Sequence, residues 1–485
     1  MNYRIIAKYM GFILIVEGIF MIPAMLISFS LGERASAYSF AVTVLITVAG
    51  GFFMSRIHSS DVIGISEGFI ICSLGWCVMS FFGALPFLFS GVLPNFMDCW
   101  FETVSGFTTT GSSIMKAVEG VPYGILYWRS FTHWIGGMGV LVFLLAVMPL
   151  AHGNGQPLNL MRAESPGPDV GKITPKISEN GRILYIIYAV MTVMEIIMLL
   201  AGGMPVFDAV TNSFATAGTG GFAVRNASIG AYDSVYLQVT IGIFMALFGV
   251  NFSIYYLLIT KQFRSAFKNE EFRWYWRIML GTTLIITLNI LPMYHNFGKA
   301  LLDSFFSCSS VMTTTGFCTA DFDKWPELSR YLLLILMIIG ASAGSTGGGI
   351  KVSRLLLLFK YLANELKNIL RPRRTSIIRM DNRHVPDNVL SGTMAFMTAY
   401  CAIVILSIAL VSLDGKDQTT NISAVLSCMN NIGPGLAVVG PTGNFSSFSN
   451  FSKFVLSMDM LLGRLEIFPV LYLLSPSIWR RKAIR

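Results

Sequence analysis

Four segments of the chain combine a short apolar run with Ser, Thr, Asn and Gly at matched positions. They cover residues 98–112, 208–222, 303–317 and 421–435. In the first three, an Asp precedes a Gly by thirteen positions, and alignment on a Ser shared with the first and third places a Gly in the same slot of the fourth. These glycines are Gly111, Gly221, Gly316 and Gly433, and they recur about every 100 residues. The pattern indicates four copies of one structural unit.

The chemistry available to such a unit is cation binding by the backbone. Each copy reads as a helix, a half-helix of about ten residues, a Thr-Thr-Gly-like turn and a second helix. Non-helical backbone at membrane depth is tolerated only where protein buries it or where it lines a wet cavity. Four such turns around one axis would place carbonyl oxygens in a ring able to replace the hydration shell of a monovalent cation. The alternative is that the clusters are ordinary extracellular turns, but their matched register favours the ring.

The composition requires a membrane to hold these units. Of 485 residues, 54% are hydrophobic and only 13% are charged, about half the charge of a soluble domain. This excludes a water-soluble protein, a disordered chain and a small disulfide scaffold. The seven cysteines include no Cys-x-x-Cys pair and are expected to be buried free thiols.

Apolar runs of about 20 residues predict ten spanning helices. They lie near residues 9–31, 37–55, 64–89, 125–149, 181–202, 235–259, 277–294, 329–345, 388–412 and 453–474. The first run is too long for a signal peptide and contains Glu17, so we interpret it as a retained helix. This topology places roughly three times as many Lys and Arg residues on one side as on the other. We therefore expect both termini in the cytoplasm and the basic side facing anionic lipid rather than nucleic acid.

The motifs together resemble those of the Trk/Ktr potassium-transporter superfamily, and specifically its TrkH/TrkG-type membrane subunit. The resemblance covers nearly the whole chain and rests on the four repeated segments together with four further motifs. These motifs are residues 128–139, 340–354, 430–436 and 460–469. A helix pair before the first repeat is more similar to the Trk branch than to the shorter Ktr branch.

The resemblance implies an all-α polytopic membrane protein with four pseudo-symmetric helix–pore-loop–helix repeats around a central ion pore, plus an N-terminal helix hairpin. We place the hairpin at residues 1–60 and a basic cytoplasmic segment at 357–385. The four pore repeats are placed at residues 61–150, 178–262, 270–356 and 386–485.

The implied function is gated K⁺ uptake across the cytoplasmic (inner) membrane, without enzymatic activity or a bound cofactor. Na⁺ and Rb⁺ are further candidate ions. The implied partners are a second copy of the chain, in a homodimer, and a cytosolic TrkA-like nucleotide-binding regulatory subunit. An alternative is a Na⁺/K⁺ or H⁺/K⁺ symporter with alternating access. Glu17, Glu67 and Glu195 could then couple proton movement, but we expect them to be packed polar residues.

The resemblance assigns eight residues to a selectivity filter. The four repeat glycines take the filter-glycine role, and the residues before them supply neighbouring carbonyls: Thr110, Gly220, Thr315 and Ile432. The fourth repeat departs from the others through Ile432 and Pro434.

Residues 340–349 contain five glycines and five other small residues. Because each glycine costs a helix about 1 kcal/mol relative to Ala, we expect a loop that interrupts the second helix of repeat three beneath the filter. The run resembles the intramembrane gate of the family, formed here by Gly340, Ser342, Gly344, Ser345, Gly347, Gly348 and Gly349. The alternative is close helix packing through small residues. A G-x-S-x-G match and a near P-loop in this run lack the strand that either enzyme motif requires.

The sequence also predicts roles for two charged sites within the membrane and for one basic stretch outside it. Arg464, within the last helix, is interpreted as an electrostatic barrier that abuts this loop, or alternatively as a partner of Glu466 or Asp459. Arg129 and Glu102 are expected to form a buried structural pair behind the first filter segment. The basic stretch 351–386 either anchors the topology or docks the regulatory subunit.

Overall fold

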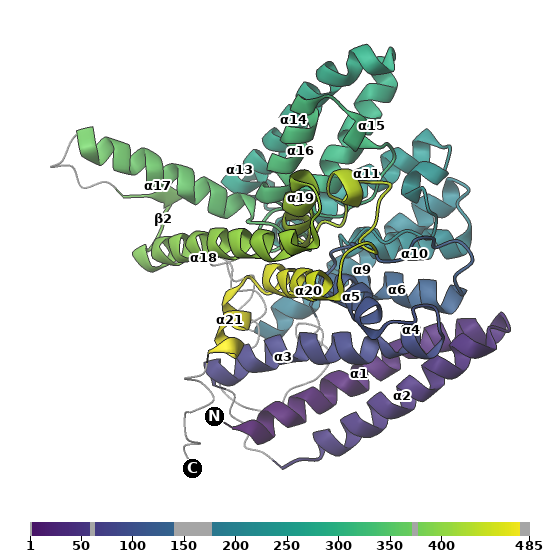
Figure 1. Cartoon of the computed structure of the whole chain (residues 1–485). Helices are drawn as coiled ribbons and strands as arrows, with labels where there is room; N and C mark the ends of the chain where they lie inside the picture. The colour runs from purple at the N-terminus through teal and green to yellow at the C-terminus, as the bar shows by residue number, and fades with distance from the viewer. Residues whose placement is uncertain (1, 59–63, 140–176, 371–376, 476–485) are drawn as a thin grey trace.

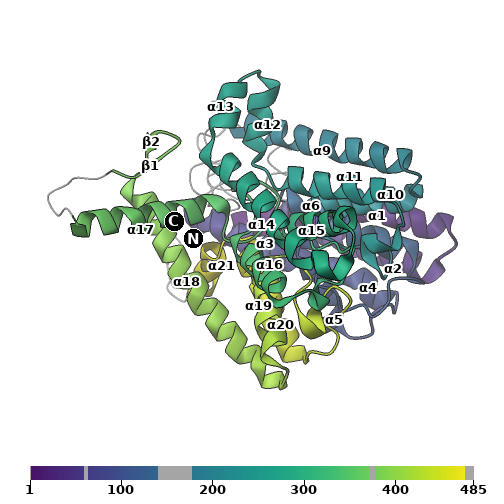
Figure 2. The same cartoon turned by 90° about the horizontal axis from the view of Figure 1, so that it is seen from above.

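The computed structural model describes residues 2–58, 64–139, 177–370 and 377–475. Within these ranges the chain is largely helical, and the strands β1 (Arg379–Met380) and β2 (Arg383–His384) form one short antiparallel hairpin. The all-α architecture predicted from the sequence is therefore confirmed. Figures 1 and 2 show the helices gathered into one body from which the long helix α17 projects.

The first two helices form the predicted N-terminal hairpin. Helix α1 (Tyr3–Ser30) runs against α2 (Arg34–Ser55) along one side of the body (Figure 1). Gly11 and Gly51 let the two backbones approach, because a β-carbon on Gly11 would lie 2.7 Å from the carbonyl oxygen of Gly51. Such small-residue contacts are typical of helices that associate in a membrane.

The remaining helices repeat one pattern four times: a long helix, a buried half-helix, a turn and a second helix. The half-helices are α5 (Phe96–Phe107), α10 (Val206–Ala217), α15 (Phe297–Met312) and α19 (Gln418–Met429). The long helices before them are α3 (Ile65–Gly83) with α4 (Leu85–Phe89), α9 (Ile177–Ala201), α14 (Glu270–Tyr294) and α18 (Asp387–Val411). The helices after them begin with α6 (Tyr123–Gly137), α11 (Val235–Phe248), α16 (Glu327–Ile339) and α20 (Asn450–Arg464).

Shorter elements connect these units. Helix α12 (Phe252–Ile259) follows α11, and α13 (Phe263–Lys268) leads to α14. Helix α17 (Val352–Leu370) follows the glycine-rich run of unit three, and α21 (Phe468–Leu474) follows α20. Single 3₁₀ turns lie at Ser228–Ala231, Phe322–Lys324, Ser412–Asp414 and Ala437–Val439.

The second helix of a unit is interrupted more often than the sequence analysis expected. The run 235–259, predicted as one span, is the pair α11 and α12, bent by 93°. The run 453–474 breaks between α20 and α21, where Glu466 and Ile467 both have positive φ. The run 329–345 ends as helix at Ile339. For the run 125–149, helix α6 ends at Gly137, and the part from residue 140 lies outside the described residues.

The described residues consequently contain six helices long and apolar enough to cross a membrane, or seven if the bent pair counts as one span. Six of the ten predicted runs are single long helices, 235–259 is the bent pair, and the runs 329–345 and 453–474 are interrupted, because hydrophobic composition does not reveal where backbone hydrogen bonding stops. At the break after α11, the Asn251 side chain caps α12 by accepting from the Ser253 N–H at 2.9 Å, so a new helix starts there.

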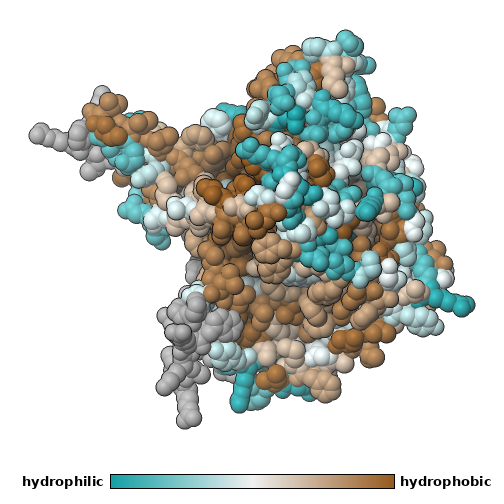
Figure 3. Space-filling view, viewed as in Figure 1, coloured by the Kyte–Doolittle hydropathy of each residue, from teal (hydrophilic) through white to brown (hydrophobic). Residues whose placement is uncertain are grey.

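The outer surface of the body is apolar where the long helices face outward. Large hydrophobic side chains are exposed along α2, α9, α14 and α18, for example Leu45, Ile197, Leu288 and Ile405. Figure 3 shows hydrophobic residues over much of the face turned to the viewer. An apolar surface this extensive marks contact with lipid or protein. Both ends of the described chain lie beside the start of α3, because Asn2 donates to Glu67 and Tyr472 donates to Ser66.

Candidate functional site

All four half-helices end in the same hydrogen-bonded turn. The N–H groups of Thr110, Gly220, Thr315 and Ile432 donate to carbonyls five residues earlier, at 2.9, 2.8, 2.8 and 2.9 Å. The residues just before them are left-handed: Thr109, Thr219, Thr314 and Asn431 have φ of 57°, 54°, 59° and 55°. A 6→1 bond over a left-handed residue is the Schellman motif that ends many helices. The four turns therefore leave their half-helices at the same register.

These turns meet in a closed ring. A β-carbon added to Gly111 would overlap the carbonyl oxygen of Gly220, one on Gly221 would overlap that of Thr315, and one on Gly316 would overlap that of Ile432. The ring closes at Gly433, where the β-carbon would lie 2.9 Å from the carbonyl oxygen of Thr110. All eight residues that the sequence analysis grouped as a filter thus lie together, and each unit contacts the next in chain order.

The glycines are required by both conformation and space. Their φ values are 79°, 75°, 87° and 103° for Gly111, Gly221, Gly316 and Gly433, a region that residues with a β-carbon resist. A side chain would in addition collide with the neighbouring carbonyl oxygen.

The fourth unit keeps this geometry despite its different sequence. Ile432 packs its side chain into the hydrophobic cluster of unit three, so only its backbone takes part in the turn. Asn431 replaces the threonine of the other units and donates through Nδ2 to Thr110 Oγ1 and to Met460 O, both at 2.9 Å. The Asn amide thereby joins the fourth turn to the first.

The predicted buried pair lies behind the first turn. Arg129 Nε is 2.7 Å from Glu102 Oε1, and both side chains are buried. Glu102 also accepts from the Ile114 N–H at 2.8 Å, just after the first ring glycine. Arg129 donates to Ala223 O at 3.1 Å and lies over the Phe222 ring at 3.5 Å from its centre. The pair therefore connects the segments that follow the turns of units one and two.

His133 is a buried residue beside the ring to which the sequence analysis assigned no role. Its Nδ1 lies 2.7 Å from Gly106 O, and its Nε2 is 3.3 Å from the Phe222 backbone nitrogen. An accepting Nε2 leaves Nδ1 as the donor, so the neutral ring bridges α5 and the segment after Gly221. Its position four residues after Arg129, on the same helical face, was the available signal.

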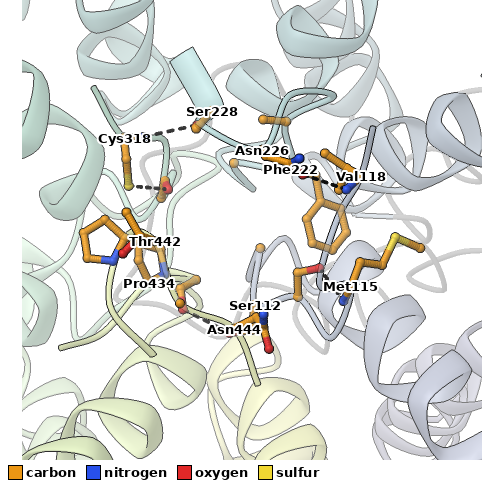
Figure 4. Close-up of a pocket in the computed structure, with 18 of the residues that line it drawn as sticks. Ser112, Met115, Val118, Phe222, Asn226, Ser228, Cys318, Pro434, Thr442 and Asn444 are labelled. Carbon is orange, nitrogen blue, oxygen red and sulfur yellow. Dashed lines mark hydrogen bonds between the residues drawn. The ribbon is translucent and has the colours of Figure 1, made fainter. Parts of the chain in front are cut away.

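Above the ring lies a cavity of about 200 Å³, lined by all four ring glycines. The loops that surround it come from the four units and are shown in Figure 4. Each loop bonds to the next: Val118 N–H to Asn226 Oδ1, Gly230 N–H to Cys318 O, Ala437 N–H to Asp323 Oδ1, and Phe445 N–H to Ser113 O, at 2.8 to 3.1 Å. A second closed set of contacts thus stabilises the ring from outside.

On the other side of the ring lies the glycine-rich run. Helix α16 ends at Ile339 and α17 starts at Val352, so the predicted interruption is present and the alternative of a continuous packed helix is wrong. The Gly348 N–H donates to Thr314 Oγ1 at 2.6 Å, and a β-carbon on Gly347 would lie 2.7 Å from Thr313 O. The loop therefore contacts the turn of unit three directly, and Gly348 also abuts the Asn430 carbonyl of unit four.

Arg464 joins this loop to unit one. Its Nη1 donates to Thr346 O at 2.8 Å, and its Nη2 donates to Gly137 O at 2.7 Å and also to Gly136 O. Its predicted alternative partners are engaged elsewhere, since Glu466 pairs with Arg354 and Asp459 accepts from Ser407 Oγ at 2.7 Å. Arg464 abuts the loop as the sequence analysis expected.

The described part of the chain contains no cluster of three or more His, Cys, Asp or Glu that could hold a metal ion. All seven cysteines are free. The site consists of a ring of backbone carbonyls between a cavity on one side and the glycine-rich loop on the other.

An integral membrane protein built from four such units around one ring is an ion-transport fold. The sequence profile of the TrkH family, described as cation transport protein, matches residues 36–481. The chain is 35% identical to the Trk system potassium uptake protein TrkH of Escherichia coli K12, over 99% of this chain and 100% of that one. It is 31% identical to the Trk system potassium uptake protein TrkG of the same organism, over 99% of each.

A solved structure agrees with the sequence matches. The crystal structure of the potassium transporter TrkH from Vibrio parahaemolyticus superimposes with a TM-score of 0.87 at 32% identity, covering 99% of this chain and 100% of that one. This chain therefore belongs to the TrkH family of cation transport proteins. Membership confirms the predicted family and the prediction of a transporter rather than an enzyme.

Proposed function

We propose that this protein takes up K⁺ across the cytoplasmic membrane through a gated pore whose filter is the ring of backbone carbonyls. The observation that supports this most strongly is the ring closure, in which each filter glycine lies against the carbonyl oxygen of the neighbouring unit. The relatives named above are potassium uptake proteins. An inside-negative potential supplies about 2.3 kcal/mol per charge for each 100 mV, enough to accumulate K⁺ without other energy input.

In this proposal the carbonyls of Thr110, Gly220, Thr315 and Ile432 replace water around the ion. Helices α5, α10, α15 and α19 end at the ring, so the partial negative charge of four helix C-termini points at the site. The lining consists of peptide oxygens without a formal charge, which bind an alkali cation strongly enough for it to enter and weakly enough for it to leave.

The gate in this proposal is the loop beneath the ring, with Gly340, Ser342, Gly344, Ser345, Gly347, Gly348, Gly349 and Arg464 as its residues. The guanidinium of Arg464 places a fixed positive charge next to the loop and close to the path of a cation leaving the filter. Both the loop and this charge would have to move for an ion to pass. The loop and Arg464 together contact units one, three and four, so a single displacement of the loop would clear the path beneath the filter.

The cytoplasmic side in this proposal is the end that carries both termini and α17. The basic stretch that begins in α17 would meet anionic lipid or a TrkA-like nucleotide-binding subunit. Helix α17 projects from the body (Figures 1 and 2) and exposes a row of apolar side chains: Phe359, Leu362, Leu366, Ile369 and Leu370. An exposed apolar face of this size supports a protein contact there, and the second copy of a homodimer is the partner we propose for it.

The deciding experiment is uptake of radiolabelled Rb⁺ into proteoliposomes of the purified protein, with and without the cytosolic subunit and with competing Na⁺ or K⁺. A gated pore should give high turnover that depends on the membrane potential, with K⁺ competing better than Na⁺. A fixed ratio of Na⁺ or H⁺ to Rb⁺ at low turnover would contradict a pore and indicate symport.

A further inference from the structure

Glu271 contacts the glycine-rich loop on both sides, although it belongs to a different helix. It is the second residue of α14 and only 5% of it is exposed. Its Oε1 accepts from the Ala343 N–H at 2.7 Å and from the Ser353 N–H at 3.1 Å. Ala343 lies in the first half of the loop, and Ser353 lies in the first turn of α17, just beyond the loop. One carboxylate oxygen therefore holds the two flanks of the loop together.

Neither the Ala343 N–H nor the Ser353 N–H has an acceptor within a helix of its own. The Ser353 N–H is among the first four of α17, which have no carbonyl four residues before them within that helix. A carboxylate at a helix N-terminus is also favoured by the helix dipole. A buried carboxylate, in turn, requires donors, and charged hydrogen bonds of this kind are stronger than neutral ones.

The neighbouring residue serves a different purpose, which makes it a natural control. Glu270 pairs with Lys360 of α17 and accepts from the Asp381 N–H of the β1–β2 hairpin at 3.3 Å. Neither contact involves residues 340–351. The first turn of α14 thus carries two carboxylates, of which one holds the loop and the other holds the projecting helix.

We propose that Glu271 is a positioning residue that latches the loop in its place beneath the filter, and that passage of an ion requires this latch to release. While the Ala343 and Ser353 N–H groups share one oxygen of Glu271, residues 343 and 353 are both held at the start of α14. This rests on the proposed function of the loop as a gate, and it adds a residue outside the loop whose removal should favour the open state.

The first test is basal uptake of radiolabelled Rb⁺ into vesicles of phosphatidylethanolamine and phosphatidylglycerol, without the cytosolic subunit. Glu271→Ala should raise basal uptake about tenfold, since two charged hydrogen bonds are lost. Glu271→Gln, which keeps the oxygen but not the charge, should raise it about threefold. Glu270→Gln should stay within about twofold of the parent. Adding Gly316→Ser to Glu271→Ala should abolish the increase if the ions pass through the filter.

The second test reads the loop itself. Ser345→Cys, introduced together with Cys401→Ser to remove the exposed native thiol, reports loop accessibility through its rate of maleimide labelling. Glu271→Ala should increase that rate several-fold, whereas Glu270→Gln should leave it unchanged. Equal elution profiles on size exclusion would show that the variants are folded.

The two tests separate this proposal from the proposed function. Unchanged basal uptake and unchanged labelling in folded Glu271→Ala protein would overturn the latch. Faster labelling in a protein whose parent carries no Rb⁺ under any condition would support the latch and contradict the pore.

Discussion

The ring of the proposed filter and the loop beneath it are both glycine-rich and both would present backbone to the proposed ion path, yet they are fixed in different ways. In the ring, the same 6→1 hydrogen bond forms within each unit, from Thr110 to Ser105 in the first and from Ile432 to Ser427 in the fourth. The conformation of each turn is therefore set by its own half-helix. The four turns then support one another through the close approach of glycine and carbonyl.

The loop depends largely on groups supplied by other parts of the chain. Its contacts include Glu271 of α14, Thr314 of the third turn and Arg464 of α20. A segment whose position is imposed from outside can change that position when the outside contacts change, whereas a locally determined turn cannot. Glycine thus serves a fixed turn in the ring and, in the proposed gate, a loop that can move.

The largest effect is expected from a substitution in the ring. Gly316→Ser should reduce Rb⁺ uptake at least about a hundredfold, because a side chain at φ 87° would collide with the Ile432 carbonyl and disturb one of four filter positions. Growth of an uptake-deficient strain at low K⁺ gives a second readout. Gly281→Ala in α14, where a β-carbon would meet no neighbour within 4 Å, is the matched control. Normal growth of the Ser variant would contradict the filter assignment.

At the loop the expected change has the opposite sign. Arg464→Ala should raise basal Rb⁺ uptake about tenfold, because it removes the hydrogen bonds to Thr346 and Gly137 together with the positive charge. Deleting residues 340–349 should also raise it. Arg464→Lys retains the charge but not the forked donors, so an intermediate value would separate the two causes. Arg182→Ala, which removes an exposed positive charge elsewhere, is the control for loss of charge alone. If the Arg464→Ala variant and the deletion both take up Rb⁺ like the parent, the gate assignment fails.

Features that repeat in the sequence, such as the ring glycines, could be predicted, whereas features set by local backbone geometry could not. The four ring glycines were predicted to lie together because an internal repeat places a glycine at the same position of each unit, and the steric requirements of the ring explain that choice. The left-handed threonines at positions 109, 219 and 314 could not be found, since β-branched residues ordinarily avoid positive φ. The break between α11 and α12 was hidden by an unbroken apolar run, although Gly249 and the capping Asn251 mark it.

Contacts between distant segments were harder still. Arg464 was assigned to the loop by resemblance, but its bonds to Gly136 and Gly137 of unit one follow only from how the units pack. Glu271, at the start of a helix in a basic region, gave no sign that it would be buried against a loop about 70 residues later. The hydrophobic pattern of a sequence predicts helices, but it does not predict which distant segment a single polar side chain will contact.

The support behind the ring gives a smaller, measurable effect. Arg129→Gln should lower the apparent melting temperature in detergent by several degrees, because removing one member of a buried pair costs about 3–5 kcal/mol. Pairing it with Glu102→Gln should recover part of the loss. Lys324→Gln, which breaks the exposed pair with Asp321, should have little effect. Equal shifts for the buried and exposed pairs would contradict a structural role of Arg129 behind the filter.

The smallest effect is expected where the fourth half-helix begins, at its end remote from the ring. Asp417 caps α19 by accepting from the Thr420 N–H at 3.0 Å, and its bonds to the Thr420 hydroxyl and N–H hold the pKa of this exposed carboxyl below its ordinary value. A lowered pKa stabilises the fold above the ordinary value near 3.9, and this contribution is lost as the pH falls through the folded pKa.

Asp417→Ala should therefore lower the melting temperature at pH 7 by about one or two degrees, with a smaller difference from the parent at pH 3. Asp417→Asn, which keeps an acceptor oxygen, should lie between the two. Because the far end of α19 is fixed by its own Schellman turn and by the ring, Rb⁺ selectivity should not change. A selectivity change in the Ala variant would mean that the ring depends on outer anchors as the loop depends on Glu271 and Arg464, and the contrast between the two regions would then disappear.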